Sequence, residues 1–303
     1  MFAAFLAAFF FALNATCASH SVRAFGTLYT NLTRLVIAAV LLGLFAHTVG
    51  HGFASASLGW FLLSGVIGMG LGDLGVYAAL PLLGSRLTLL MTQCLAAPIA
   101  ALGEWLWLGN RLTALQALWG AVILIGVAVA LMPSRSSPPK VRVQPIGFLF
   151  GLIAACGQGF GALVSRKGVT VATAAGESVA NATFGLTATY HRILAGLVFT
   201  TLWFLVLYLL KRTPPAPATS PAERRTGRWW VLANGLAGPV AGVGCYQWAL
   251  ATTPSGLVLP IAATTPLLAI PIAFWLEGDR PSRRSILGGV IAVAGCIALT
   301  LNR

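Results

Sequence analysis

Long apolar stretches recur along the whole chain, and short clusters of Gly, Pro and Arg separate them. Each stretch has roughly the 20 residues that an α-helix needs to cross the ~30 Å hydrocarbon core of a bilayer. The pattern therefore predicts ten membrane-spanning helices. Their expected ranges are 2–22, 28–47, 58–82, 86–107, 113–132, 146–166, 189–210, 229–251, 256–276 and 284–301.

The segment 171–188 interrupts this pattern. Its sequence, VATAAGESVANATFGLTA, is too polar and too short to span a bilayer. We therefore expect an inserted loop or a surface helix at this place.

Composition supports a membrane location. The chain of 303 residues is 58% hydrophobic and only 8% charged, whereas soluble domains carry about 25% charged residues. The net charge of +13 arises mainly from the connecting stretches 134–142, 211–228 and 279–284. Basic residues in such loops usually set topology and contact lipid headgroups. The expected partners are therefore membrane lipids and not nucleic acid.

The cysteines give no sign of a metal or redox centre. The five of them lie in five different apolar segments and form no Cys-x-x-Cys pair. Small buried thiols are the expected role, without a disulfide framework or a metal site. No cofactor is expected.

The two halves of the chain resemble each other in sequence. Residues 1–133 form the first expected repeat, 134–145 a basic Pro/Ser linker, and 146–303 the second repeat, which carries the insertion 171–188. Each repeat has five spans, and because five is odd, the second enters the membrane from the opposite side. All-α inverted repeats related by a pseudo-two-fold axis in the membrane plane are therefore predicted. Matching positions include Phe5 with Phe148, Arg23 with Arg166, Arg34 with Arg192, Gly65 with Gly235, Gly68 with Gly238, Gly72 with Gly242, Ser85 with Ser255 and Pro98 with Pro266.

Four pairs of segments carry a resemblance to a known family. They are TRLVIAAVLL with HRILAGLVF, QCLAAPIAAL with AATTPLLAIP, WLGNRLT with LEGDRPS, and GAVILIGVAVAL with GGVIAVAGCIAL. In this order they resemble the drug/metabolite transporter superfamily and, within it, the EamA type. The resemblance covers nearly the whole chain. It implies a transporter with a cavity between its halves, lined mainly by helices 1, 3, 4, 6, 8 and 9.

Asp73 is the single charged residue between Gly68 and Ser85. A carboxylate within a span usually faces a bundle interior or a water-filled path, because an unpaired charge in hydrocarbon costs several kcal/mol. Asp73 is expected either to line the cavity and bind a substrate amine or a proton, or to form an ion pair with Arg34 or Arg86. Its repeat mate is Val243, so this charge breaks the symmetry of the halves.

Further cavity candidates are polar or aromatic residues on the helices that the resemblance assigns to the cavity. For each of them, hydrogen bonding between helices is the alternative interpretation. They are Asn14 and His20 on the first helix, Tyr77 one turn after Asp73, Gln93 on the fourth, Gln158 on the sixth, Tyr246, Gln247 and Trp248 on the eighth, and Thr264 and Thr265 on the ninth.

Six small or helix-bending residues are candidates for hinges. Glycines four positions apart let helix backbones approach closely, and helices packed in this way could also slide or bend during transport. A proline inside a helix removes a backbone hydrogen bond, which either helps to shape a cavity or is tolerated as a local bend. The six are Gly68, Gly72, Gly238, Gly242, Pro98 and Pro266.

Three other charged residues are expected near the membrane surface. Glu104 lies about two turns before the end of its helix and is expected to reach the interface. Arg34 and Arg192 occupy matching positions near the starts of the second and seventh helices. Headgroup or helix-end contacts are expected for both, and capture of an anionic group is the alternative. The two residues lie in different halves and face opposite sides, so they would not bind one small substrate together without a large movement.

Inverted halves that exchange conformations can expose a midplane site to each side in turn. The sequence therefore predicts a secondary transporter of small organic metabolites in the cytoplasmic (inner) membrane, and the resemblance implies export of amino acids or related solutes. The chain has no GxxxxGK[ST] phosphate loop, so protons or a counter-substrate are the expected means of coupling. The alternatives are an intramembrane lipid-modifying enzyme and a non-transporting scaffold or sensor.

The orientation stays open, and the chain is expected to be a monomer or a homodimer. Most of the 19 Lys and Arg residues lie beside the loops that follow odd-numbered helices. By the positive-inside rule this distribution places both termini outside the cell. Members of the resembled family are drawn with both termini inside.

Overall fold

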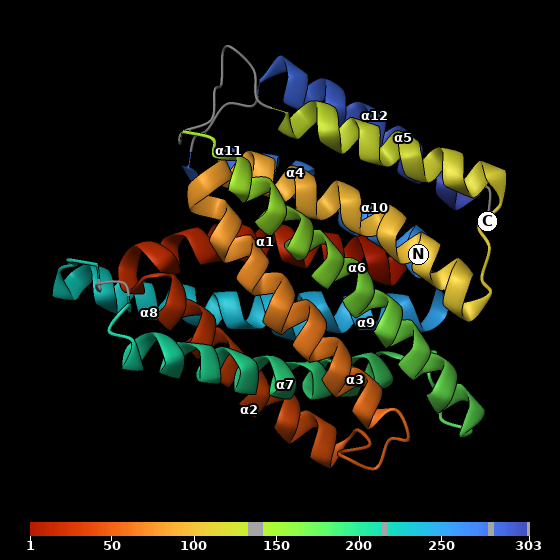
Figure 1. The fold of residues 1–303 in the computed structure, drawn as a ribbon, viewed down its shortest axis with the longest axis horizontal. Coiled ribbons are helices and arrows are strands. Elements are labelled where there is room, and N and C mark those ends of the chain that lie inside the picture. The colour runs from red at the N-terminus through yellow and green to blue at the C-terminus, as the bar shows by residue number, and fades with distance from the viewer. Residues whose placement is uncertain (133–141, 214–216, 278–281, 302–303) are drawn as a thin grey trace.

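The computed structural model describes residues 1–132, 142–213, 217–277 and 282–301, and every regular element in these ranges is a helix (Figure 1). The first half contains α1 (Phe2–Phe25), α2 (Thr27–Thr48), α3 (Leu58–Gly65), the π-helical segment η1 (Val66–Gly72), α4 (Asp73–Leu108) and α5 (Ala114–Leu131). The second half contains α6 (Pro145–Ala174), α7 (Ala182–Leu209), α8 (Pro221–Gly235), the π-helical segment η2 (Leu236–Gly242), α9 (Val243–Thr252), α10 (Ser255–Ala262), α11 (Thr265–Glu277) and α12 (Arg283–Leu301).

Nine helical segments of the described chain are long and apolar enough to cross a membrane. The tenth expected span, 229–251, lies in the unbroken helical run α8–η2–α9. The first part of this run, α8, is rich in charged residues, and the run packs among α1, α2 and α7. A helix surrounded by other helices needs fewer lipid-facing apolar residues. The predicted all-α polytopic membrane fold is confirmed.

The insertion expected at 171–188 is wrong. α6 continues to Ala174 and α7 already begins at Ala182, so only a short link joins them. Gly176, with φ 80°, follows the end of α6 in the left-handed region that glycine tolerates best. Asn181 caps α7, because its side-chain oxygen accepts a hydrogen bond from a backbone N–H of the first turn at 2.8 Å.

The polar residues of this stretch fit a helix because the helix itself satisfies them. A threonine hydroxyl can donate to a carbonyl one turn earlier, and Thr173 and Thr187 do so, each at 2.9 Å. In the link, the Glu177 carboxylate accepts hydrogen bonds from the Ser55 hydroxyl at 2.9 Å and from the Ala56 backbone N–H at 2.7 Å. The α6–α7 link is thereby fastened to the α2–α3 connection.

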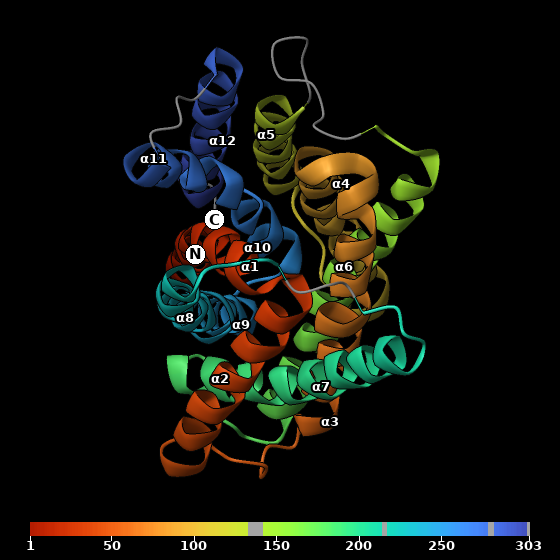
Figure 2. The same ribbon diagram turned by 90° about the vertical axis from the view of Figure 1, so that its left-hand side faces the viewer.

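The helix contacts of the two halves are related by exchange. α3 and η1 pack on α6 and α7, and in the same way α8 and η2 pack on α1 and α2. The contacts of α5 with α12, α2 with α7, and α4 with α10 each join corresponding helices. Figure 2 shows the α5–α12 pair at one end of the molecule and α2, α3 and α7 at the other. This is the contact pattern expected of two inverted five-helix repeats.

A pair of π-helical segments interrupts the third and eighth helices. η1 and η2 occupy matching sequence positions, and each contains two of the predicted hinge glycines. π turns inside longer helices are rare and often lie at functional sites. A Cβ atom on Gly157 of α6 would overlap the Cα atom of Gly72, so η1 packs backbone to backbone on α6. Close backbone packing through small residues is a main source of helix association in membranes.

The two predicted hinge prolines differ in position. α4 is helical throughout, changes direction along its length (Figure 1), and contains Pro98 in its interior, as expected. Pro266 does not lie in mid-helix, because the ninth expected span is divided into α10 and α11 and Pro266 is the second residue of α11. A proline at a helix start removes no intrahelical hydrogen bond. The mid-helix interpretation of Pro266 is therefore wrong.

Candidate functional site

A cavity of about 360 Å³ lies between the two halves. Its walls come from corresponding helices of both repeats: α1 and α6, α2 and α7, η1 and η2, and α4 together with α9, α10 and α11. Apolar walls with a few polar groups are typical of sites for small molecules. The polar side chains on the wall are Asn14, Arg34, Asp73, Thr92, Gln93, Gln158, Arg192, Tyr246 and Thr265.

Asp73 lies on the cavity wall and forms an ion pair there. The Arg34 guanidinium NH2 is 3.5 Å from Asp73 Oδ2, and the Asp73 side chain keeps 31% of its surface exposed. Arg34 Nε donates a hydrogen bond to Asn31 Oδ1 at 2.8 Å, which holds the guanidinium in place. The ion pair with Arg34 and the position on the cavity, considered above as alternatives, occur together.

Arg192 reaches the same cavity from α7 and is only 5% exposed. Its NH1 group donates to the Ser165 hydroxyl at 3.0 Å, while its Nε has no hydrogen-bond partner among the described residues. Within the described part of the chain, no carboxylate lies within the 4.0 Å that defines an ion pair. The repeat mate Arg34 has Asp73 as its partner, whereas the position that matches Asp73 is Val243.

Glycines of the π segments make room for two of these polar groups. A Cβ atom on Gly68 would lie 2.9 Å from Arg192 NH2, and a Cβ atom on Gly238 would overlap Asn14 Oδ1. Real side chains do not approach so closely, so glycine at both positions allows a polar group to lie against the helix backbone. The hinge glycines therefore have a packing role in this structure, and their bending stays a prediction.

The amide and phenol groups of the wall fall into two kinds. Gln158 Nε2 donates to Gln93 Oε1 at 3.2 Å, which links α6 to α4. Asn14 Oδ1 and the Tyr246 hydroxyl are buried and have no hydrogen-bond partner among the described residues. A buried polar group without a partner costs about 1–3 kcal/mol. A ligand in the cavity could supply the missing partners.

A second polar cluster lies near the end of α4. The Glu104 carboxylate is only 2% exposed and accepts hydrogen bonds from Arg166 Nε at 2.9 Å, Asn110 Nδ2 at 2.9 Å and the Ser255 backbone N–H at 2.6 Å, and also from the Ser255 hydroxyl. Arg166 NH1 donates in turn to the Leu250 carbonyl at 2.6 Å. The cluster joins α4 to α6 and α10 of the other half. The expectation that Glu104 reaches the membrane interface is wrong, because these donors hold it inside.

A comparison with protein families decides the classification. The model of the EamA-like transporter family matches residues 1–132 and 145–301, which is nearly the whole chain. The chain belongs to the EamA-like transporter family. It is therefore an integral, multi-pass membrane transporter of the drug/metabolite type.

Solved structures show the same fold for this transporter. The chain matches 29 chains of solved structures. One of them, described as "Crystal structure of protein", is 18% identical, with a TM-score of 0.73 over 99% of this chain and 96% of that chain. At this identity the likeness concerns the fold alone. No curated protein matches the chain in sequence.

The predicted cavity residues of the transporter are divided between the cavity and the helix core. The structure brings together Asp73, Asn14, Gln93, Gln158 and Tyr246 on one wall, although their ligand-binding role stays a prediction. Thr265 lies on the wall as well.

Five other candidates are not on this wall or cannot be placed. Thr264 is buried, donates to the Ile261 carbonyl at 2.7 Å and does not line the cavity. Gln247 is 1% exposed and Trp248 packs against Gly185 of α7, and neither is among the residues that line the cavity. Consecutive residues of a helix point in directions about 100° apart, so the neighbours of Tyr246 face elsewhere. His20 stacks on Trp230, with 4.4 Å between ring centroids. The side chain of Tyr77 lies outside the described residues.

The expectation for Arg34 and Arg192 was wrong. Both were expected at the headgroups, yet both guanidinium groups reach the central cavity. The reason is depth, because α2 begins at Thr27 and α7 at Ala182, so the two arginines lie about two to three turns inside their helices. The sequence repeat indicated that these arginines have a shared role, since an arginine occupies the same position in each half.

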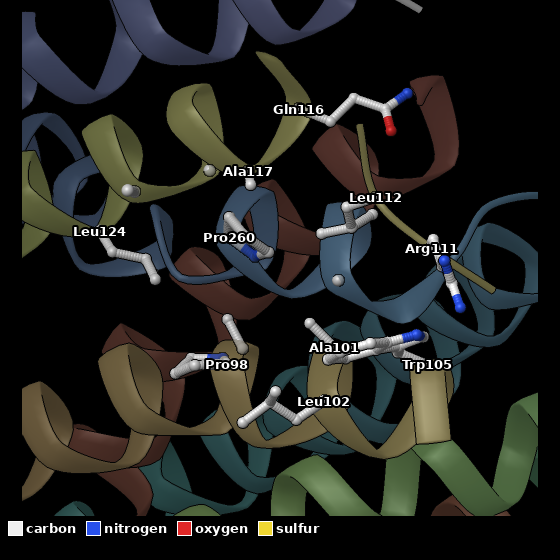
Figure 3. A pocket seen from close by; sticks show the side chains of 14 residues that line it. Pro98, Ala101, Leu102, Trp105, Arg111, Leu112, Gln116, Ala117, Leu124 and Pro260 are labelled. Carbon is white, nitrogen blue, oxygen red and sulfur yellow. The ribbon is translucent and has the colours of Figure 1, made fainter. Parts of the chain in front are cut away.

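A larger pocket of about 560 Å³ lies to one side, between α4, α5 and α10 (Figure 3). Pro98 and Trp105 of α4 face Pro260 of α10 across it, and Arg111 and Gln116 supply polar groups at one end. None of its described side chains is a buried polar group without a partner. We therefore regard the smaller central cavity as the candidate site, and Pro98 as part of the side pocket.

Proposed function

We propose that this transporter is a secondary carrier that moves small organic solutes across the cytoplasmic membrane by alternating access between its halves. The central cavity supports the proposal, because corresponding helices of both repeats enclose it next to the paired π segments. Two halves of similar fold can exchange conformations and open such a site to each side in turn. π turns are also places where long helices bend.

The proposed substrates are amino acids or related metabolites, moved in the direction of export. A cavity of about 360 Å³ has the size of a small organic solute. Asp73 is exposed to the cavity and paired with Arg34, so it is the proposed place for a coupling proton, and exchange against a counter-substrate is the alternative. Membrane lipids are the other proposed partners, and the apolar side pocket of Figure 3 suits an acyl chain.

The test is a flux measurement in proteoliposomes. Vesicles that contain the purified protein are loaded with labelled amino acids, organic acids, amines and neutral solutes, and efflux is followed with and without a proton gradient and an external counter-substrate. We expect saturable efflux of a subset of the panel. Absence of flux under every condition would contradict the proposal. Mass spectrometry of the lipids in the same vesicles would reveal a lipid-modifying enzyme.

Two matched variants test whether the cavity is the route. Val76 lies on the cavity wall, whereas Val198 is 59% exposed on α7. Val76→Trp should fill the cavity and abolish flux, while Val198→Trp adds the same side chain outside the bundle and should leave flux near the wild-type rate. Equal flux in both variants would show that solutes take another path.

A further inference from the structure

Arg192 holds a permanent positive charge inside the protein, and among the described residues no carboxylate lies within ion-pairing distance of it. A guanidinium stays protonated in proteins, so burial cannot neutralise it. The side chain is 5% exposed, and its only described hydrogen bond is the one from NH1 to the Ser165 hydroxyl. A buried charge of this kind is costly unless an opposite charge accompanies it. An anion bound in the cavity would supply the direct ion pair that the described chain does not give Arg192.

The comparison with the other repeat shows what is missing. Arg34, the mate of Arg192, is 3.5 Å from the Asp73 carboxylate. Val243 stands where symmetry would place the same carboxylate for Arg192. Arg34, Asp73 and Arg192 are the ionisable acids and bases on the described cavity wall apart from the Tyr246 phenol, so the wall carries one net positive charge.

The groups around Arg192 are suited to an acceptor. Its Nε–H has no partner, and the Tyr246 hydroxyl on the same cavity wall has none either. Gly68 leaves the guanidinium space at the backbone of η1, because a Cβ atom there would lie 2.9 Å from NH2. Both unpartnered groups can donate hydrogen bonds, and a guanidinium binds planar carboxylates particularly well.

We propose that the transported solute binds through a carboxylate, held by Arg192 with Tyr246 as a second donor. The inference rests on the proposed function and names the chemical group that the cavity recognises. A carboxylate contributes one negative charge, which matches the single positive charge in excess, whereas a phosphate monoester carries nearly two. Asp73 already has Arg34 as its partner, so the described wall has no free carboxylate for a cationic solute without an acid group.

The test uses carboxylates with matched amides and amines, and a phosphate monoester as a second kind of anion. Isovalerate, benzoate and leucine are each compared with their amides, together with isoamylamine, benzylamine and methyl phosphate. Binding is read as the shift in unfolding temperature of the purified full-length protein, which does not require transport. We expect at least one carboxylate to stabilise the protein while its amide and the corresponding amine do not.

Three variants assign the effect to Arg192. Arg192→Gln should weaken carboxylate binding by about 10- to 100-fold, the range for loss of a hydrogen bond to a charged group. Val243→Asp should have the same consequence, because it gives Arg192 an internal counter-ion at the symmetric position. Arg225→Gln removes an equal charge from the exposed start of α8 and should change nothing. Val243→Asp keeps the test valid if Arg192→Gln fails to fold.

Several results would overturn the proposal. They are stabilisation by an amide or amine equal to that by its carboxylate, stronger binding of methyl phosphate than of every carboxylate, no stabilisation by any probe, and unchanged carboxylate binding in Val243→Asp. A protein that binds carboxylates but moves nothing in the flux assay would retain this inference and lose the proposed function. Flux of amines or neutral solutes alone would retain the proposed function as a carrier and overturn the inference of a carboxylate site.

Discussion

The two halves of this transporter share their backbone contacts and differ in their charges. η1 and η2 are π-helical at matching positions, and each packs on the first two helices of the opposite half. In contrast, Arg34 has a carboxylate at 3.5 Å, whereas the matching Arg192 has none among the described residues. The fold is thus repeated in which helices pack together, while the polar chemistry is particular to each half.

The ends of the two halves differ in the same way. Glu104 joins α4 to α6 and α10 through Arg166 and Ser255. Counting along the aligned hairpins, the sequence has Ala273 where the second half would need the corresponding carboxylate. The two repeats are therefore joined by an ion-pair cluster at Glu104 that has no counterpart at the matching position of the second half. We expect this cluster to contribute more to stability than any other polar contact discussed here.

The largest effect is expected from Glu104→Gln. The variant keeps the shape of the side chain but leaves the Arg166 guanidinium without its carboxylate at 2.9 Å. Removing one partner of a buried ion pair costs about 3–5 kcal/mol. Unfolding in detergent, followed by far-UV circular dichroism, measures the loss.

The control for this variant is Glu223→Gln. Glu223 accepts hydrogen bonds from Ser220 at the exposed start of α8, outside the predicted span. Its loss should cost less than about 1 kcal/mol, in the range of an exposed helix cap. Equal losses in the two variants would show that the Glu104 cluster does not fasten the halves.

The sequence predicts how far Glu104 lies from the end of its helix, but not the direction in which its side chain points. The depth of a residue follows from its distance to the helix end, whereas its direction depends on which donors are near. Those donors come from α6, α10 and the hairpin after α4, and Ser255 is far from Glu104 in sequence. The six predicted residues that line the cavity lie on helices that the family resemblance had assigned to it.

An intermediate effect is expected from alanine at the matching glycines Gly65 and Gly235. A Cβ atom on Gly65 would overlap the Arg192 carbonyl oxygen, which is backbone and cannot move away easily. A Cβ atom on Gly235 meets a methyl group of Ile37 at 3.1 Å and the Arg34 carbonyl oxygen at 3.5 Å. Gly65→Ala should cost about 1–3 kcal/mol through overpacking. The same unfolding assay measures it.

Gly235→Ala should cost far less than Gly65→Ala. The helix gains about 0.5–1 kcal/mol when alanine replaces glycine, which offsets a mild contact. Equal destabilisation of the two variants would mean that the halves pack more symmetrically than the structure has them. The sequence paired these two glycines correctly, but it could not rank them, because the distance to the opposing backbone is set by packing between the halves.

The smallest effect is expected at the adjacent residues Tyr246 and Gln247. Gln247 is 1% exposed, and neither its amide oxygen nor its amide nitrogen has a hydrogen-bond partner among the described residues. Gln247→Met keeps the volume and removes the unsatisfied amide, so it should raise stability by about 1 kcal/mol and leave carboxylate binding unchanged. Tyr246→Phe should also leave stability equal or slightly higher, but it should weaken carboxylate binding, because it removes the proposed second donor from this wall residue.

Whether Gln247→Met raises or lowers stability shows if the Gln247 amide has partners in another conformation. An amide that is unsatisfied in every conformation would only lower stability, and its removal could only help. A loss of stability or of flux in Gln247→Met would mean that the amide gains partners in another conformation of the cycle, as a two-state element requires. The two neighbours would then gain their hydrogen-bond partners at different steps of the cycle. The Tyr246 hydroxyl would gain one when the solute binds, and the Gln247 amide when the halves move.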